Sequence, residues 1–575
     1  MPEKIRFIID GKEIETEKGT TILNAARENG IYIPTFCYDD CVDVYGACGI
    51  CVVEAEGVPK LLRSCATIAS DGMKINTRSD RVIRSRKIAL ELIMSNHTGD
   101  CKAPCSLACP AGTDCQGYVG LIADGQYDEA IKLIKERIPL PASIGRVCPH
   151  PCEKKCRRGL VDEPVAIAFM KSFAADKAFA NGDGYIPETK ADTGKNVSII
   201  GGGPAGLSAA YFLREMGHGV TVYDMMPKMG GMLRYGIPQY RLPKEILDKE
   251  TSLIEKMGAV FKNGIKIGKD ITFDEIRSNS DAVLVAIGAW KSSGMRVPGE
   301  ELDGILGGID FLREVVLKNA TSIGKRVAVC GGGNTAMDAC RTAVRLGAEE
   351  VYVVYRRTRG EMPADDVEIT EAEEEGVTFK FLTNPDEFIG ENGHVKAVKL
   401  QKMKLGEPDA SGRRAPVPIE GEFETLDVDT VIMAIGQKIS AEGFESLEKT
   451  KRGNILADEA GFFTSVDGVF GAGDATNKGA DIAVSAIGEA RKAALSIDAY
   501  LSGRKYAYKK PFYSEIEKTA EDFKGKEKVP RVKMPTLSPD ERRSNFNEIV
   551  KGYSDEDAQR EGSRCLECGC RDVFE

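Results

Sequence analysis

The chemistry that this sequence can support is set first by its cysteines. Seventeen cysteines occur in 575 residues, yet only Cys330 and Cys340 lie between residues 157 and 564. Groups with C-x2-C and C-x3-C spacing in a large chain favour metal binding, whereas disulfide frameworks are typical of small secreted domains. Zinc is the alternative for any one pair of cysteines, so the spacing within each group must decide.

The first group of cysteines has the spacing of a [2Fe–2S] site. Cys37, Cys48, Cys51 and Cys65 follow the pattern C-x10-C-x2-C-x13-C, and Cys41 is left over as a non-ligand. Small residues around the middle pair would let backbone N–H groups approach the sulfides, whereas zinc would more often use two C-x2-C knuckles. The segment resembles the [2Fe–2S] domain of the complex I large peripheral subunit and of [FeFe] hydrogenases. That resemblance implies a plant-ferredoxin-like β-grasp fold.

A glycine-rich turn predicts a dinucleotide-binding unit of the Rossmann type. In NVSIIGGGPAGLSAAYFLREMGHGVTVYD, Gly201, Gly203 and Gly206 form G-x-G-x-x-G between a strand and a helix, and Asp224 ends the next strand. The glycines allow a tight turn, the approach of a pyrophosphate and close packing of helix on strand, while the acid can bind a ribose diol. A merely structural glycine turn is the alternative.

A second glycine-rich unit begins at KRVAVCGGGNTAMDACRTAVRLGAEEVYVVYRR, but its second strand ends in two arginines instead of an acid. An arginine side chain offers a planar, permanently charged fork for phosphate, which favours NADP(H) over NAD(H). A solvated arginine face is the alternative. The residues expected at the NADP site are Gly331, Gly333, Asn334, Thr335, Ala336, Arg356 and Arg357.

The flavin is assigned to the first unit by a segment near its end. The stretch TSVDGVFGAGDATNKGADIAVSAIGEARKAA places a strand before Gly473 and Asp474 and an alanine-rich helix after them, as in flavoproteins with two dinucleotide sites. The strands 281–289 and 429–437 look like the crossing strands between the two modules. The residues expected at the FAD site are Gly201, Gly203, Ala205, Gly206, Asp224, Gly231, Leu233, Gly288, Gly473, Asp474 and Ala483.

Three further stretches carry a family resemblance. GRVCPHPCEKKCRRGLVDEPVAIAFMKSFAAD, GGMLRYGIPQYRLPKEIL and VYRRTRGEMPA resemble the glutamate synthase small-subunit family. That family includes the NADP-binding large subunit of the ferredoxin:NADP transhydrogenase that bifurcates electrons from NADPH. The resemblance spans residues from about 100 to 500. It implies two [4Fe–4S] clusters in a helical domain, followed by an FAD domain with an inserted NADP domain.

The resemblance also implies cluster ligands. Cys101, Cys105 and Cys156 correspond to ligands of one [4Fe–4S] cluster, and Cys109, Cys148 and Cys152 to ligands of the other. Where the family has a carboxylate or glutamine ligand for the second cluster, this chain has Lys171, which cannot ligate iron when protonated; Cys115 is the nearest substitute. His97 precedes Cys101 by four residues, as in the His–Cys motif of the hydrogenase and complex I proteins. It is either a ligand of a cluster or a nearby histidine that does not bind iron, on the surface or beside a ligand.

The R-C-L-x-C motif that opens the family's cluster domain is displaced in this chain. It is absent near residue 100 and present as RCLECGC at residues 564–570. Three thiols do not complete a four-cysteine site, so we expect this segment to fold back or to dock on another subunit. There it would hold a further [4Fe–4S] cluster through Cys565, Cys568 and Cys570. A zinc knuckle or a frayed tail is the alternative.

The sequence therefore predicts a multidomain α/β protein. We expect a β-grasp domain (1–80), a helical [4Fe–4S] domain (81–190), an FAD domain in two parts (191–320 and 441–505), an NADP domain (321–440) and an extended arm (506–575). A net charge of −10 without a basic run argues against a nucleic-acid partner, and no apolar stretch is long enough for a transmembrane helix. The first residues do not resemble a signal peptide, so we expect a cytoplasmic protein.

Together these features predict an enzyme that carries electrons. The expected cofactors are FAD, NADP(H), one [2Fe–2S] cluster and one to three [4Fe–4S] clusters, and no nucleophile–base pair is needed. The expected partner is an electron-bifurcating NADH/ferredoxin flavoprotein, a hydrogenase subunit or a formate dehydrogenase subunit. The alternatives are a glutamate synthase small subunit, which the fused [2Fe–2S] domain argues against, and a non-enzymatic redox sensor or scaffold.

Overall fold

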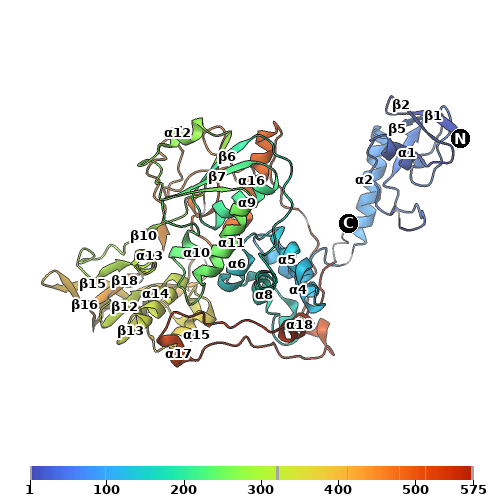
Figure 1. Ribbon diagram of the computed structural model, residues 1–575. Helices are drawn as coiled ribbons and strands as arrows, with labels where there is room; N and C mark the ends of the chain where they lie inside the picture. The colour runs from blue at the N-terminus through green and yellow to red at the C-terminus, as the bar shows by residue number, and fades with distance from the viewer. Residues whose placement is uncertain are drawn as a thin grey trace. The chain divides into compact units, whose positions relative to one another are not determined.

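The structure is a computed structural model that describes residues 3–39, 41–97, 99–318, 323–410, 412–477, 479–511 and 513–570. The chain divides into two compact units, unit 1 (Met1–Gly99) and unit 2 (Asp100–Glu575) (Figure 1). In the part of the chain that the structure describes, no helix is both long enough and apolar enough to cross a membrane.

Unit 1 is a small mixed sheet with one helix against it and one after it. Its strands are β1 (Lys4–Ile9), β2 (Lys12–Glu17), β3 (Val52–Ala55), β4 (Leu62–Arg63) and β5 (Lys74–Asn76), in the order β2-β1-β5-β3-β4. Alternation along β1 buries Ile5, Phe7 and Ile9 against α1 (Ile22–Glu28). Helix α2 (Asp80–Ser95) packs on β3, where Arg86 donates to the carbonyl of Val52 at 2.7 Å. The unit therefore extends beyond residue 80.

Unit 2 begins with a helical domain in which the cysteines sit at helix ends. Its helices are α3 (Pro104–Ala108), α4 (Cys115–Ala123), α5 (Tyr127–Lys135), α6 (Pro141–Val147), α7 (Pro151–Lys154), a 3-10 turn (Arg157–Leu160) and α8 (Ile167–Ala180). Helix α8 packs against α4, α5, α6 and α7. Cys109 and Cys148 directly follow α3 and α6, and Cys115 opens α4. Backbone N–H groups at such ends are available to sulfur.

The next domain is built on a five-stranded parallel sheet. Its strands are β6 (Asn196–Ile200), β7 (Gly219–Asp224), β8 (Val260–Asn263), β9 (Ala282–Val285) and β20 (Val469–Gly471), in the order β20-β9-β6-β7-β8. Helices α9 (Pro204–Glu215) and α16 (Ala483–Leu501) pack on each other (Figure 1). A Cβ on Gly488 of α16 would stand 2.4 Å from the carbonyl oxygen of Pro110, so only glycine lets the helical domain approach this closely. The two domains share one hydrophobic core.

A second parallel sheet with its own core is inserted into this domain. Its strands are β11 (Ile305–Gly307), β12 (Arg326–Cys330), β13 (Glu350–Tyr355), β14 (Thr378–Phe381) and β18 (Thr430–Met433), in the order β11-β18-β12-β13-β14. Helices α13 (Gly308–Lys318), α14 (Asn334–Arg345) and α15 (Asp366–Glu374) accompany it, with an antiparallel sheet of β15 (Thr383–Glu391), β16 (His394–Pro408) and β17 (Arg414–Asp427). Strands β10 (Lys291–Ser292) and β19 (Gln437–Lys438) pair where the chain passes between the two parallel sheets.

The last described segment, residues 513–570, is called the C-terminal arm. It is mostly extended and carries a 3-10 turn (Ala520–Phe523) and the short helices α17 (Pro539–Arg543) and α18 (Asp555–Gly562) (Figure 1). Helix α17 packs on α14 of the inserted domain, and α18 packs on α4 of the helical domain. The arm therefore joins elements that are far apart in the sequence.

Candidate functional site

A cavity of about 360 Å³, called the shared cavity, lies between the two parallel-sheet domains and reaches the helical domain. From the expected FAD site it is lined by Gly201, Gly203, Ala205, Asp224, Gly231, Leu233, Gly288, Asp474 and Ala483, and from the expected NADP site by Asn334 and Thr335. Gly206 and Gly473 are not part of this lining. A Cβ on Gly206 would stand 1.8 Å from the carbonyl oxygen of Gly201, and one on Gly473 would stand 2.9 Å from Cβ of Ala205.

The first glycine-rich turn has the shape that a pyrophosphate requires. Gly201 has φ +110°, and a Cβ there would stand 2.2 Å from the carbonyl oxygen of Ala286. Helix α9 begins at Gly203 without a side-chain cap, so its first N–H groups can bind an anion. The Asp224 carboxylate accepts from the N–H of Gly202 at 2.6 Å and of Met226 at 2.7 Å, and burial raises its pKa. These bonds hold Asp224 at the cavity wall.

The opposite wall of the cavity comes from the chain after β20. Burial, with a smaller contribution from the charges of Asp481 and Glu489, raises the pKa of Asp474 to about 6. Helix α16 begins after Ile482, again without a side-chain cap. An acid and an open helix start therefore face the same cavity, which fits the expected contacts of Asp474 and Ala483 with FAD.

The second glycine-rich turn repeats the first in the inserted domain. Gly331 has φ +148°, and a Cβ there would stand 2.3 Å from the carbonyl oxygen of Ala434. Helix α14 begins at Gly333 without a side-chain cap, and Ala336 is buried in its first turn. The Asn334 side chain accepts from the N–H of Asp365 at 3.1 Å. The expected phosphate-binding turn is therefore formed.

The two arginines after β13 lie in different surroundings. Arg357 is buried, where it donates to the carbonyl of Arg414 at 2.7 Å and pairs with Asp409 at 2.5 Å. Arg356 is exposed. The structure thus gives Arg357 a role in joining β13 to the antiparallel sheet and leaves Arg356 as the better candidate for a 2′-phosphate.

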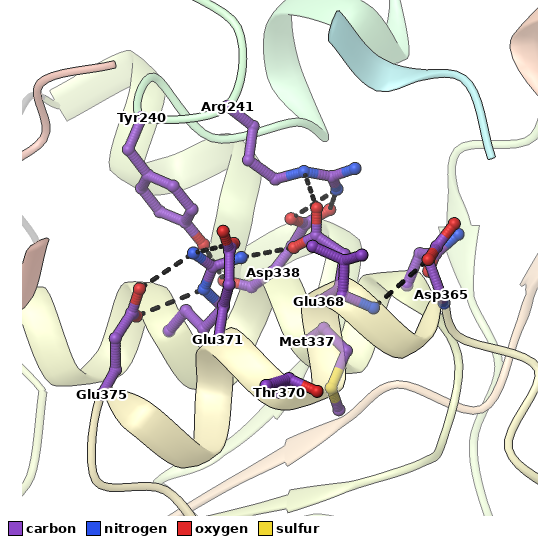
Figure 2. A network of polar contacts seen from close by, with 12 residues as sticks. Tyr240, Arg241, Met337, Asp338, Asp365, Glu368, Thr370, Glu371 and Glu375 are labelled. Atoms are coloured by element: carbon purple, nitrogen blue, oxygen red, sulfur yellow. Dashed lines mark hydrogen bonds and ion pairs between the residues drawn. The ribbon is translucent and has the colours of Figure 1, made fainter. Parts of the chain in front are cut away.

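A buried network of charged side chains holds α14 in place (Figure 2). Arg241 pairs with Asp338 at 2.8 Å and with Glu368 at 2.8 Å, and both Arg241 and Asp338 line the shared cavity. Arg341, which is fully buried, pairs with Glu375 at 2.8 Å and also with Glu368. The network connects the segment before α11 (Lys244–Lys256) to α14 and α15, and so orients the start of α14 toward the cavity.

The sequence motifs did not single out two residues that line the shared cavity, Arg241 and Trp290. Trp290 is the only tryptophan of the chain and lies two residues after Gly288, with its ring centroid 6.0 Å from that of Tyr235. Its rarity and its place directly after an expected FAD residue are the signals that could have identified it.

The four cysteines expected for the [2Fe–2S] cluster come together in unit 1. The sulfurs of Cys51 and Cys65 are 3.3 Å apart, and the N–H of Cys48 donates to the sulfur of Cys37 at 3.5 Å. The negative charges of Cys51, Cys37 and Cys48 contribute, after burial, to raising the pKa of Cys65 to about 12. Cys41 is exposed. The donor set fits a cluster held by four thiolates.

A first group of four cysteines in unit 2 surrounds a buried lysine. Hydrogen bonds with Cys105, Cys109 and Cys152 raise the pKa of Cys115 well above its ordinary value. Burial lowers the pKa of Lys171, but the charges of Cys148, Cys152, Cys109 and Cys115 outweigh this effect and raise it. Cys109, Cys115, Cys148 and Cys152 are called the inner group, because Cys148 also lines the shared cavity.

A second group combines the helical domain with the C-terminal arm. Five cysteines line one small cavity: Cys105, Cys115, Cys156, Cys565 and Cys568. Cys115 is counted with the inner group because it also contacts Cys109 and Cys152, and the other four are called the outer group. Cys101, which the family resemblance placed with Cys105 and Cys156, does not line this cavity, and its sulfur accepts from the N–H of Ser514 at 3.3 Å. The structure therefore pairs Cys105 and Cys156 with different cysteines from those expected.

Of the further residues proposed as ligands, Cys570 lies outside both groups. The Cys570 sulfur donates to the carbonyl of Asp100 at 3.6 Å, and Cys570 does not line the outer cavity. His97 lies in unit 1 after α2, whereas Cys101 lies in unit 2, so its role as a ligand stays a prediction.

Among the described residues, no three His, Cys, Asp or Glu side chains are arranged to hold one metal ion. The ligands of a cluster bind several iron atoms and therefore stand farther apart than the four ligands of one zinc ion.

Comparison with known proteins matches three parts of the chain to family models. A family model of pyridine nucleotide-disulphide oxidoreductases matches residues 195–490, and a 2Fe-2S iron-sulfur cluster binding domain matches residues 2–80. Residues 94–183 match a family described as dihydropyrimidine dehydrogenase domain II, 4Fe-4S cluster.

Curated relatives extend over several of these domains together. Subunit beta of the NADP(+)-dependent formate dehydrogenase of Moorella thermoacetica is 41% identical over 500 residues, covering 81% of this chain and 70% of that protein. Subunit beta of the NADPH-Fe(3+) oxidoreductase of Geobacter sulfurreducens is 39% identical, covering 81% and 75%. The glutamate synthase [NADPH] small chain of Azospirillum brasilense is 35% identical, covering 71% and 89%. The chain therefore belongs to the pyridine nucleotide-disulphide oxidoreductase family and is an NADP(H)-dependent oxidoreductase with FAD and with [2Fe–2S] and [4Fe–4S] domains.

Proposed function

We infer that this chain exchanges electrons between NADP(H) and FAD in the shared cavity and relays them through its iron–sulfur clusters to a partner subunit. The observation that supports this function best is the lining of that cavity. It combines residues of both glycine-rich turns with Cys148 of the inner group. One cavity would therefore adjoin the nicotinamide site, the flavin site and a cluster site.

In this scheme the protein binds and orients the cofactors. The open starts of α9 and α14 bind the two pyrophosphates, and Asp224 accepts a hydrogen bond from a ribose hydroxyl. Bound FAD would supply the exchange between two-electron hydride transfer and one-electron transfer. Because Cys148 lines the shared cavity, a cluster in the inner group would lie beside a bound flavin. The contact of Cys115 with Cys105 would make a cluster in the outer group the next in line.

The partner is proposed to be another subunit of a redox complex in the cytoplasm, where cluster-binding thiols stay reduced. Two curated relatives are named as beta subunits, one of a formate dehydrogenase and one of an Fe(3+) oxidoreductase, which supports a dehydrogenase partner for this chain. A hydrogenase subunit or the NADH/ferredoxin flavoprotein of an electron-bifurcating complex would use the same cofactors. The latter assignment rests on the resemblance to the transhydrogenase subunit.

A glutamate synthase small subunit is the second candidate, because a small chain of that enzyme is 35% identical over 433 residues. The [2Fe–2S] domain at residues 2–80 favours the first candidate, since it adds a further one-electron carrier. Purification of the native complex with identification of the bound subunits separates the two. A dehydrogenase or hydrogenase subunit supports the first candidate, whereas a glutamate synthase large subunit overturns it.

The proposed reaction is tested by adding NADPH to the FAD-loaded, anaerobic holoprotein. We expect NADPH to bleach the flavin absorbance and to drive reduction of a viologen dye, with NADH acting much more weakly. Gly331→Ala should retain FAD and lose both reactions, because its Cβ would collide with Ala434. Gly182→Ala, where a Cβ meets no atom within 4 Å, is the matched control. A wild-type flavin that dithionite reduces and NADPH does not would support the scaffold alternative.

A further inference from the structure

The two cysteines of the R-C-L-x-C motif lie far from the expected cluster domain in sequence and next to it in space. Cys565 and Cys568 line the same small cavity as Cys105 and Cys156. Arg157 lines it too, as does Cys115, which also contacts Cys109 and Cys152 of the inner group. The family that describes the 4Fe-4S domain matches only residues 94–183, so these two thiols lie outside the matched region. We propose that Cys565 and Cys568 of the C-terminal arm complete the ligand set of one [4Fe–4S] cluster with Cys105 and Cys156.

The residues just before Cys565 anchor the arm to the helical domain. Arg564 is 2% exposed, pairs with Asp162 at 3.0 Å and donates to the carbonyl of Glu163 at 2.6 Å. Glu561 is fully buried and accepts from the N–H of Ala166 at 2.9 Å. Asp162, Glu163 and Ala166 belong to the loop that links Cys156 to α8. The protein itself therefore holds Cys565 beside Cys156, before any metal contributes.

The residues just after Cys568 anchor the arm to the other half of the site. The N–H of Gly569 donates to the Gln116 side chain at 2.8 Å, and the same side chain donates to the Gly569 carbonyl at 3.1 Å. A Cβ on Gly569 would stand 2.2 Å from the backbone nitrogen of Ala103, so only glycine allows this approach. Ala103 precedes α3, which carries Cys105. Both ends of the Cys565–Cys568 turn are thus fixed against the segments that carry the other two ligands.

The electrostatics of this cavity suit a ligand set of four thiolates. Arg157 forms a buried ion pair with Asp100 at 2.5 Å, and its guanidinium also contacts Cys568. A cluster with four cysteine ligands carries net negative charge, which a neighbouring guanidinium offsets. The third thiol of the motif, Cys570, instead contacts the carbonyl of Asp100 and stays outside the cavity. The motif therefore supplies two ligands to a shared cluster and holds no further cluster of its own.

The test compares iron content in variants of the anaerobically purified holoprotein. The double variant Cys565→Ser with Cys568→Ser should lose about four iron atoms per FAD and one electron paramagnetic resonance signal of the dithionite-reduced protein. Cys570→Ser is the matched control and should retain both. Unchanged iron in the double variant, or an equal loss in Cys570→Ser, would overturn the proposal.

A combined variant separates loss of one cluster from general unfolding. Adding Cys156→Ser to the double variant should remove no further iron, because all three residues would serve one cluster. Adding Cys148→Ser instead should remove about four more iron atoms, because Cys148 belongs to the inner group. If adding Cys156→Ser removed about four further iron atoms, Cys156 would serve a different cluster from Cys565 and Cys568, and the proposal would be contradicted.

The inference rests on the proposed function only in taking the metal group to be an iron–sulfur cluster. NADPH-driven bleaching of the flavin is measured on the same samples, and the double variant should keep it. If NADPH fails to reduce the wild-type flavin while the iron losses follow the expected pattern, the proposed function is wrong and the proposal of a shared cluster is supported.

Discussion

Arg356 and Arg357 follow the same strand, β13, but they differ in their exposure and in their contacts. Arg357 is committed to Asp409 and to the carbonyl of Arg414, whereas the exposed Arg356 makes no ion pair within the described residues. The sequence motif could not distinguish them, because Asp409 and Arg414 are brought to β13 only by the antiparallel sheet.

Replacing Arg356 should therefore change cofactor choice without harming the fold. We expect Arg356→Ala to weaken NADPH binding by about 1.5–3 kcal/mol, or roughly 10–100-fold, because a charged hydrogen bond to the 2′-phosphate is lost. The affinity for NADH should change little. Titration of both nucleotides by flavin absorbance measures this, and Arg326→Ala at the opposite end of the sheet is the control. An equal loss for NADH and NADPH would refute the assignment.

Lys171 places a positive charge inside the inner group of cysteines. It is 3% exposed, and four thiolates raise its pKa even though burial opposes them. A charge that stays on the lysine stabilises the more negative, reduced form of a neighbouring cluster.

Lys171→Met should accordingly lower the midpoint potential of one [4Fe–4S] signal. The expected shift is on the order of 100 mV, as for a unit charge several ångströms away at an effective dielectric constant of about 20. A redox titration monitored by electron paramagnetic resonance measures it. Lys177→Met is the control, since Lys177 lies on the same helix but pairs with Asp555. An unshifted potential with full iron content would show that the lysine serves packing alone.

At the scale of elements, the charged network of Figure 2 decides where α14 points. Arg341 is fully buried and pairs with carboxylates from α15 and its C-terminal end. Arg241, from the segment before α11, pairs with one of these carboxylates, Glu368. The C-terminal arm joins this network through Arg542 of α17, which pairs with Glu371 at 3.3 Å. One set of ion pairs thus fixes the NADP turn, the cavity wall and the arm.

Breaking this network should destabilise the inserted domain more than any surface change does. Arg341→Met leaves Glu375 buried without one of its two arginines, and removing one partner of a buried pair costs about 3–5 kcal/mol. We expect a lower melting temperature and faster proteolysis within residues 323–427, with FAD still bound. Lys325→Met, which breaks the exposed pair with Glu349, should change the melting temperature little. Equal effects of the two substitutions would argue against the network.

At the scale of the whole molecule, the features that could be predicted are those whose residues lie close together in the sequence. Each glycine-rich unit lies in one continuous stretch, so Gly201, Gly203 and Asp224 could be placed from strand, turn and helix signals alone, and the structure brings them to one cavity. The fold class could be predicted for the same reason. The [2Fe–2S] cysteines also lie close in sequence, and they come together as expected.

The family resemblance implied the inner group, with Cys115 as the nearest substitute for its fourth ligand, but the outer group could not be predicted. Its composition depends on the position of the C-terminal arm, which is set by the buried contacts of Arg564 and Glu561 with the loop after Cys156. No local pattern records such contacts, because the partners lie about 400 residues apart. The displaced R-C-L-x-C motif indicated that something was missing near residue 100, but gave no means to identify what the arm would join.

The arm also sets an order of events during biosynthesis. If the outer group holds one cluster, the ribosome makes Cys156 about 410 residues before Cys568, a delay of roughly 20–80 s at about 5–20 residues per second. Two of the four ligands are made before both nucleotide-binding domains, and the other two are made after them. Cluster insertion there is then delayed until translation has passed Cys568. A chain terminated before Cys565 could fold its flavin domain and still never receive that cluster, so the presence of the cluster would show that translation had passed Cys568.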